Sequence, residues 1–143
     1  MPASLRGTFD TNVVLAAKLS PHATSPTAEI LDRWQRRDFT FLYTHDVIAE
    51  YAEKLLATGV PAFETAAFLR LLARHGEFIV IAFFHLRHYP ADADDIMFLL
   101  CALNGRATHL VSYDPHLLTL RPFYDGEVII CAPVEFLADC RKK

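Results

Sequence analysis

Short apolar runs, rich in β-branched and aromatic side chains, recur along the chain and are separated by longer stretches with the apolar spacing of helices. The runs predict five strands, which are Leu5–Phe9, Phe39–Tyr43, Phe78–Phe84, Thr108–Tyr113 and Val128–Cys131. Several of these runs are apolar throughout, as is typical of strands buried on both faces. The alternation of strands with helices therefore predicts an α/β fold, in which helices cover both faces of a parallel or mostly parallel sheet.

Capping and breaking residues set the expected helix boundaries. Ser25 followed by Pro26 is a helix start signal, and Thr44 is a good N-cap for the next helix. Pro61 starts a further helix, which Gly76 ends. The expected helices cover residues 13–19, 26–37, 45–57, 61–75, 96–104, 115–120 and 133–137. No internal repeat or linker interrupts this pattern, so residues 1–143 are expected to form one domain.

Three acids, Asp92, Asp94 and Asp95, lie together directly before the apolar run Ile96–Leu103. A helix that is apolar all round is buried, so this run predicts an interior helix entered through a cluster of carboxylates. Two carboxylates repel each other by roughly 4 kcal/mol at about 4 Å and an effective dielectric near 20. The dipole of the helix offsets part of this repulsion, and a divalent cation would offset far more.

Two further acids, Asp10 and Asp114, each follow a predicted strand. Ligands of open α/β sheets gather at the carboxyl ends of the strands, so these acids and the 92–95 cluster meet if the first and fourth strands are neighbours. Mg²⁺ and Mn²⁺ bind carboxylate oxygens and water, and one or two such ions can activate water for phosphodiester hydrolysis. The pattern favours a metal-dependent nuclease site. The alternative is that Asp92 or Asp94 is only a helix cap, with Asp95 placed favourably for the helix dipole.

Composition narrows the classes of function. With 143 residues, 52% of them hydrophobic, the chain can build a core without disulfides or structural metals. A net charge of −3 argues against tight, non-specific nucleic-acid binding, but it does not exclude a nucleic-acid enzyme. The three cysteines form no C-x-x-C motif and are expected to be buried and reduced. We see no signal peptide and no membrane span, so a soluble cytoplasmic protein is expected.

Five short motifs follow one another along the chain. They are Phe9–Val14, Thr44–Glu50, Asp94-Asp95 seven residues before Ala102, Leu110–Asp114 and the closing Ile129–Leu137. Together, and in this order, they resemble the PIN-domain family over nearly the whole chain, and the last resembles its subgroup of VapC-like toxin components of bacterial toxin–antitoxin pairs. The resemblance implies a three-layer α/β/α sandwich with a sheet of about five strands.

The resemblance also implies which residues form the site. The acids that would hold Mg²⁺ or Mn²⁺ and the attacking water are Asp10, Glu50, Asp95 and Asp114, and the residues in supporting positions are Asn12, Ser112 and Asp94. Helical periodicity alone leaves Glu50 and Glu53 equally placed, and Asp94 is open as a ligand or a supporting group. Tyr113 stands where the family usually has glycine, which narrows the backbone freedom beside Asp114.

Family members are similar in being metal-dependent endoribonucleases, usually dimeric and often held inactive by a small antitoxin. The resemblance therefore implies an RNA substrate, an antitoxin partner and a homodimer. His116 and Arg87 are candidates for RNA contacts, although His116 can instead cap the helix 115–120. The main alternative is a catalytically silent module that binds RNA or a partner. A receiver-like phospho-acceptor domain is disfavoured because Lys18 and Lys54 lie within helices and not at a strand end.

Overall fold

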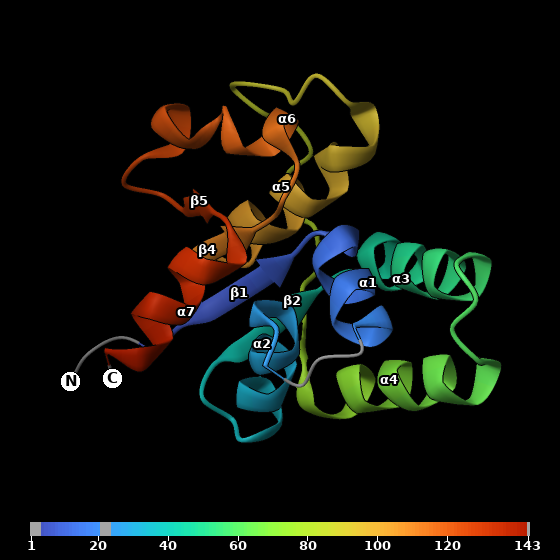
Figure 1. Ribbon diagram of the computed structural model, residues 1–143. Coiled ribbons are helices and arrows are strands. Elements are labelled where there is room, and N and C mark those ends of the chain that lie inside the picture. Colours follow the sequence, from blue (N-terminus) through green and yellow to red (C-terminus); the bar gives the residue numbers. More distant parts are fainter. Residues whose placement is uncertain (1–3, 21–23, 143) are drawn as a thin grey trace.

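The computed structural model describes residues 4–20 and 24–142, and its strands form one parallel sheet of five strands (Figure 1). The strands are β1 (Arg6–Phe9), β2 (Thr40–Tyr43), β3 (Glu77–Phe78), β4 (His109–Val111) and β5 (Ile129–Cys131). Their order is β3-β2-β1-β4-β5, and every pair is parallel. Phe9 is in register with Val111, so β1 and β4 are neighbours. The convergence of Asp10 and Asp114 depended on the first and fourth strands being neighbours, and this condition is confirmed.

The helices agree closely with the predicted ranges. They are α1 (Thr11–Leu19), α2 (Pro26–Gln35), α3 (His45–Ala57), α4 (Ala62–His75), α5 (Ile96–Asn104), α6 (Pro115–Leu118) and α7 (Pro133–Arg141), with the 3-10 segments η1 (Ala93–Asp95) and η2 (Arg121–Tyr124). The predicted caps are present, because Ser25 and Thr44 accept hydrogen bonds from the backbone N–H groups of Ala28 and Val47. Within the described part of the chain, no helix has the length and apolar character needed to cross a membrane.

Neighbouring residues of β1 show that the sheet is covered on both faces (Figure 1). The ring of Phe9 packs against Phe39, Phe41 and Phe136 of α7, with ring centroids 4.7 to 5.4 Å apart. Thr8 points to the other face, as alternation along a strand requires, and its hydroxyl donates to the sulfur of Cys101 in α5. The three-layer α/β/α sandwich is confirmed, and all three cysteines are buried as predicted.

The predicted strand over Phe78–Phe84 is wrong, because β3 ends at Phe78. Its partner β2 ends at Tyr43, whose carbonyl accepts one last bond from the N–H of Ile79. Beyond this point the chain lies past the end of the sheet, and the side chain of Asn104 accepts the N–H groups of Ala82 and Phe83. The β-rich composition of this run did not show that its strand partner would end so early.

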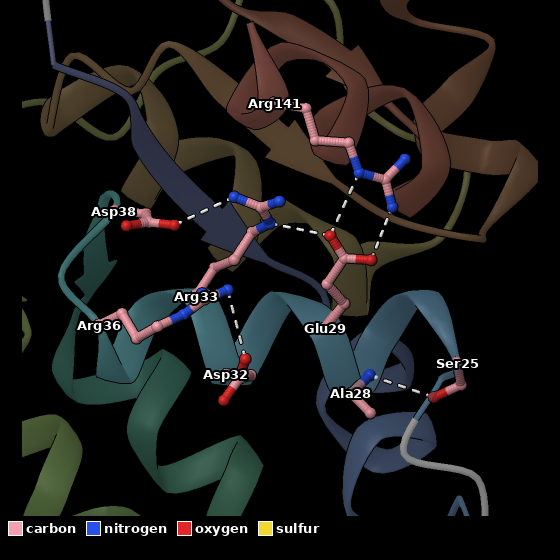
Figure 2. A network of polar contacts seen from close by, with 8 residues as sticks. All are labelled: Ser25, Ala28, Glu29, Asp32, Arg33, Arg36, Asp38 and Arg141. Carbon is pink, nitrogen blue, oxygen red and sulfur yellow. Dashed lines mark hydrogen bonds and ion pairs between the residues drawn. The ribbon is translucent and has the colours of Figure 1, made fainter. Parts of the chain in front are cut away.

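The last helix, predicted to stop at Leu137, continues to Arg141 and is tied to α2 by a polar network (Figure 2). Glu29 of α2 accepts hydrogen bonds from Arg33 one turn later, at 2.8 Å, and from Arg141, at 2.6 Å. Arg33 also pairs with Asp38 at 3.1 Å. The extra turn of α7 therefore has a partner on α2, which the sequence of α7 alone could not show.

Candidate metal centre

The carboxyl ends of β1 and β4 position the first two acids. Asp10 directly follows β1, is 4% exposed, and donates its backbone N–H to the carbonyl of Val111 at 2.9 Å. Ser112 links it to Asp114: the Ser112 hydroxyl donates to Oδ2 of Asp10 at 2.7 Å and accepts the N–H of Asp114 at 2.8 Å. Ser112, predicted as a supporting residue, thus holds both strand-end acids in place.

The start of α5 positions the remaining aspartates. Oδ1 of Asp92 accepts the N–H of Asp94 at 2.9 Å, so Asp92 is a cap, as the sequence allowed. Asp95 is 5% exposed, and its Oδ2 is buried. Among the described residues, Asp95 Oδ2 and Thr11 Oγ1 have no hydrogen-bond partner. Asp95 and Thr11 line the same cavity, whereas the third buried oxygen without a partner, Thr65 Oγ1, belongs to α4.

That cavity has a volume of about 150 Å³ and is lined mainly by acids. Its lining includes six acids and one basic side chain, which are Asp10, Glu50, Asp92, Asp94, Asp95, Asp114 and Lys54. Glu50 lines it and Glu53 does not, which resolves the choice that helical periodicity left open. Asn12 also contributes to the lining. Lys54 was not predicted here, although its position four residues after Glu50 places both on one face of α3.

A tighter subset of ligand atoms lies within this region. One side-chain atom each from Asp92, Asp95, Asp114 and His116 lies within 4.8 Å of all the others. The sequence left Asp92 open as a helix cap or as a member of the acidic cluster, and the structure shows it in both positions. His116 is not the cap of α6, because Asp114 accepts the His116 N–H at 2.9 Å and fills that role.

Arg87, the second candidate for an RNA contact, does not line the acidic cavity. It forms an ion pair with Glu127, and its guanidinium lies over the ring of Tyr124, 5.3 Å from the centroid. Tyr124 in turn donates to the backbone carbonyl of His88 at 2.6 Å. These contacts join the segment before Asp92 to η2.

Burial and mutual repulsion raise the pKa values of the clustered acids. Burial, followed by the close carboxyl of Asp114 and repulsion from Asp10 and Asp92, raises the pKa of Asp95 to about 8. Burial also raises the pKa of Asp10, although the Ser112 hydrogen bond opposes the shift. Burial also raises the pKa of Glu50, and the positive charge of Lys54 opposes part of this rise. The free protein therefore gains stability when these acids bind protons, and another cation would serve the same purpose.

The donor set fits a hard divalent cation. The cavity offers carboxylate oxygens and no thiol, which is the preference of Mg²⁺ and Mn²⁺. The single lysine in the lining cannot neutralise six carboxylates, and the unpaired Oδ2 of Asp95 lacks the partner that a buried polar atom normally has. Both observations suit a bound ion better than simple helix capping.

Tyr51 supports this site from beneath. It is fully buried, and its hydroxyl donates to the carbonyl of Phe9, next to Asp10. We expect Tyr51→Phe to lower the free energy of unfolding by about 1–3 kcal/mol, because the buried carbonyl loses its side-chain donor. Urea denaturation measures the change, with the exposed Tyr113→Phe as a control that leaves stability unaltered. Equal stability of the two variants would show that the Tyr51 hydroxyl contributes nothing.

Comparisons with known proteins agree with this architecture. A family model described as PIN domain matches residues 6–116. The fold is similar to a chain in the crystal structure of VapBC2 from Rickettsia felis bound to a DNA fragment from their promoter. The TM-score is 0.59 at 12% sequence identity, and the match covers 90% of this chain and 98% of that one. No match was found among curated proteins.

Proposed function

The chain belongs to the PIN domain family, and from the acidic cavity we propose that it is a divalent-metal-dependent endoribonuclease that hydrolyses RNA phosphodiester bonds. The observation that carries the proposal is the convergence of acids from the ends of β1 and β4 and the start of α5 on one cavity, where Asp10 and Asp95 are buried and Asp95 Oδ2 has no partner among the described residues. Structural capping alone would not require these acids to face one another.

Asp10, Glu50, Asp95 and Asp114 would hold Mg²⁺ or Mn²⁺. When bound, the ion lowers the pKa of water and neutralises charge that develops on the phosphodiester. Glu50 and the three aspartates would orient the ion within the cavity. Asp94 and Asn12 also line the cavity and would support these four acids. Lys54 places a positive charge in the same lining, where it can attract a substrate phosphate. We extend the proposal to RNA contacts by His116, which lies beside the acids, and by Arg87.

The proposal is tested by removing the ion. We expect a fluorescently labelled single-stranded RNA to be cut in Mn²⁺, to remain intact after chelation, and to be cut again when Mn²⁺ is restored. Asp10→Asn, purified in parallel, reports contaminating nucleases and should be inactive. Cleavage that persists in chelator, or that is equal in Asp10→Asn, would contradict the proposal.

Ser112→Ala tests how strongly the site depends on its support. Its hydroxyl orients Asp10 and also receives the N–H of Asp114. Loss of such an outer partner typically lowers metal affinity or activity by about 10- to 100-fold. We expect a loss in this range, measured as the Mn²⁺ concentration that gives half-maximal cleavage. Ser112→Thr keeps the hydroxyl and should retain more activity; equal losses in the two variants would contradict this role for the hydroxyl.

We further propose that the protein is the toxin of a type II toxin–antitoxin pair, acting in the cytoplasm as a homodimer. The family match and the fold shared with a chain of the VapBC2 complex support this assignment. Expression of the wild type should then arrest bacterial growth, and coexpression of a short neighbouring reading frame should restore it. Arrest by Asp95→Asn to the same extent would show that growth inhibition is independent of the proposed catalytic site.

A further inference from the structure

A second cavity lies at the opposite end of the sheet, near the starts of the strands. Its volume is about 600 Å³, and its lining residues come mainly from the C-terminal ends of α2 and α4 and the start of β2. Three basic side chains, Arg37, Arg74 and His75, lie in its walls beside one acid, Asp38. The acidic cavity therefore lies where the strands end, and the basic cavity lies where they begin.

The positive charge of this cavity is not neutralised by its surroundings. Asp38 already pairs with Arg33 at 3.1 Å, and Figure 2 shows both side chains within the α2 network. Within residues 4–20 and 24–142, no acid forms an ion pair with Arg37, Arg74 or His75. The cavity thus has at least two permanently charged guanidinium groups that can receive an anion.

The end of α2 determines the backbone conformation of Arg37. Its N–H donates to the carbonyl of Trp34 at 2.8 Å, and the N–H of Asp38 donates to that of Arg33 at 3.0 Å. These bonds form a Schellman motif, whose left-handed position is usually glycine. Arg37 occupies that position with a φ of 64°. The motif therefore fixes the backbone of Arg37 at the end of α2, in the cavity wall.

We propose that the basic cavity is a second ligand site, which binds a nucleotide through its phosphate group. Guanidinium groups recognise phosphate through paired hydrogen bonds, and the volume lies within the range of small-molecule sites. Gln35 and Thr40 in the lining supply uncharged hydrogen-bonding groups for the remainder of the ligand. The site is independent of the metal centre, because none of these residues lines the acidic cavity.

A free nucleotide and one nucleotide of an RNA strand would present the same phosphate. A neighbouring cavity of about 580 Å³ shares Leu71, Arg74 and His75 with the first and adds Arg70. An RNA strand could reach Arg70 from the first cavity, whereas a mononucleotide would use the first cavity alone. The contribution of Arg70 therefore distinguishes the two sources.

The single tryptophan of the chain makes the test direct, because Trp34 lines the cavity. The wild type is titrated with uridine monophosphate, uridine and single-stranded oligouridylate, in chelator so that no metal-dependent cleavage occurs. Tryptophan emission and the heat of binding are recorded together. We expect saturable binding of the monophosphate and none of uridine.

The variants isolate the guanidinium groups. Arg37→Asn keeps a residue that tolerates positive φ, and we expect it and Arg74→Gln each to weaken binding by about 10-fold or more, as expected for loss of a charged hydrogen bond. Arg106→Asn is the matched control. Arg106 has a φ of 52° and the same motif at the end of α5, but it does not line the cavity. Thermal unfolding confirms that each variant is folded.

The outcomes separate clearly. Tighter binding of oligouridylate, weakened by Arg70→Gln, supports an RNA strand, whereas monophosphate binding unaffected by Arg70→Gln supports a free nucleotide. Absence of both signals up to millimolar ligand overturns the proposal. So does equal binding of uridine, or equal weakening by Arg106→Asn. None of these results depends on whether the protein cleaves RNA.

Discussion

Replacing Asp95 by Asn is expected to abolish Mn²⁺-dependent RNA cleavage while leaving the fold intact. Asp95 is 5% exposed, shares its cavity with five other acids, and presents an Oδ2 without a hydrogen-bond partner in the described structure. Loss of an outer support alone lowers activity by about 10- to 100-fold, so loss of a ligand should exceed about 100-fold. The initial rate of cleavage at saturating Mn²⁺ measures the effect.

Glu50→Gln extends the test to α3, and Glu53→Gln is its matched control. Glu53 lies on the same helix as Glu50 but is exposed and does not line the cavity. The control should cleave RNA at the wild-type rate, while Glu50→Gln should lose activity. A wild-type rate in Asp95→Asn would remove Asp95 from the proposed metal site, and equal losses in the two glutamate variants would remove the special role of Glu50.

The contribution of Asp95 to the stability of the metal-free protein is expected to fall as the pH rises from about 4 to about 8. The pKa of Asp95 is raised to about 8 by burial and by its contacts with Asp114, whereas an unfolded aspartate has a pKa near 3.9. The raised pKa contributes stability that is complete below about pH 4 and is lost as the pH rises through about 8. The loss is at most about 1.4 kcal/mol per pH unit for one proton.

This pH dependence is measured by urea denaturation in chelator, as the difference between the wild type and Asp95→Asn. The difference removes groups that titrate equally in both proteins, and we expect the variant to become the more stable protein towards pH 8. Added Mn²⁺ should remove the advantage of the variant. A constant difference across this pH range would show that Asp95 is not held in a repulsive carboxylate cluster.

Much of this arrangement could be predicted because it depends on local signals. The strand-end positions of Asp10 and Asp114 follow from the apolar runs that precede them, and the pairing of β1 with β4 brings them together. Ser25 and Thr44 have the capping bonds that their residue types favour. These features depend on a few neighbouring residues and on the general geometry of parallel sheets.

Other features depend on contacts between distant segments, which no local pattern contains. Periodicity could not choose Glu50 over Glu53, because the choice depends on where α3 meets the end of β1. The inclusion of Lys54 in the acidic lining has the same origin. Strand β3 is short because its partner β2 ends at Tyr43. The residue type of Asp92 allowed either a cap or a place in the acidic cluster, and only the tertiary fold shows that Asp92 has both roles.

The central claim is that the acidic cavity binds a divalent cation, and thermal unfolding of the wild type and Asp95→Asn with and without Mn²⁺ tests it most directly. An ion at about 100 times its dissociation constant stabilises the folded state by roughly 2.7 kcal/mol, which raises the unfolding midpoint by several degrees. We predict this rise in the wild type and its loss in Asp95→Asn. An unchanged midpoint in the wild type, or an equal rise in both proteins, would contradict a metal site at these carboxylates.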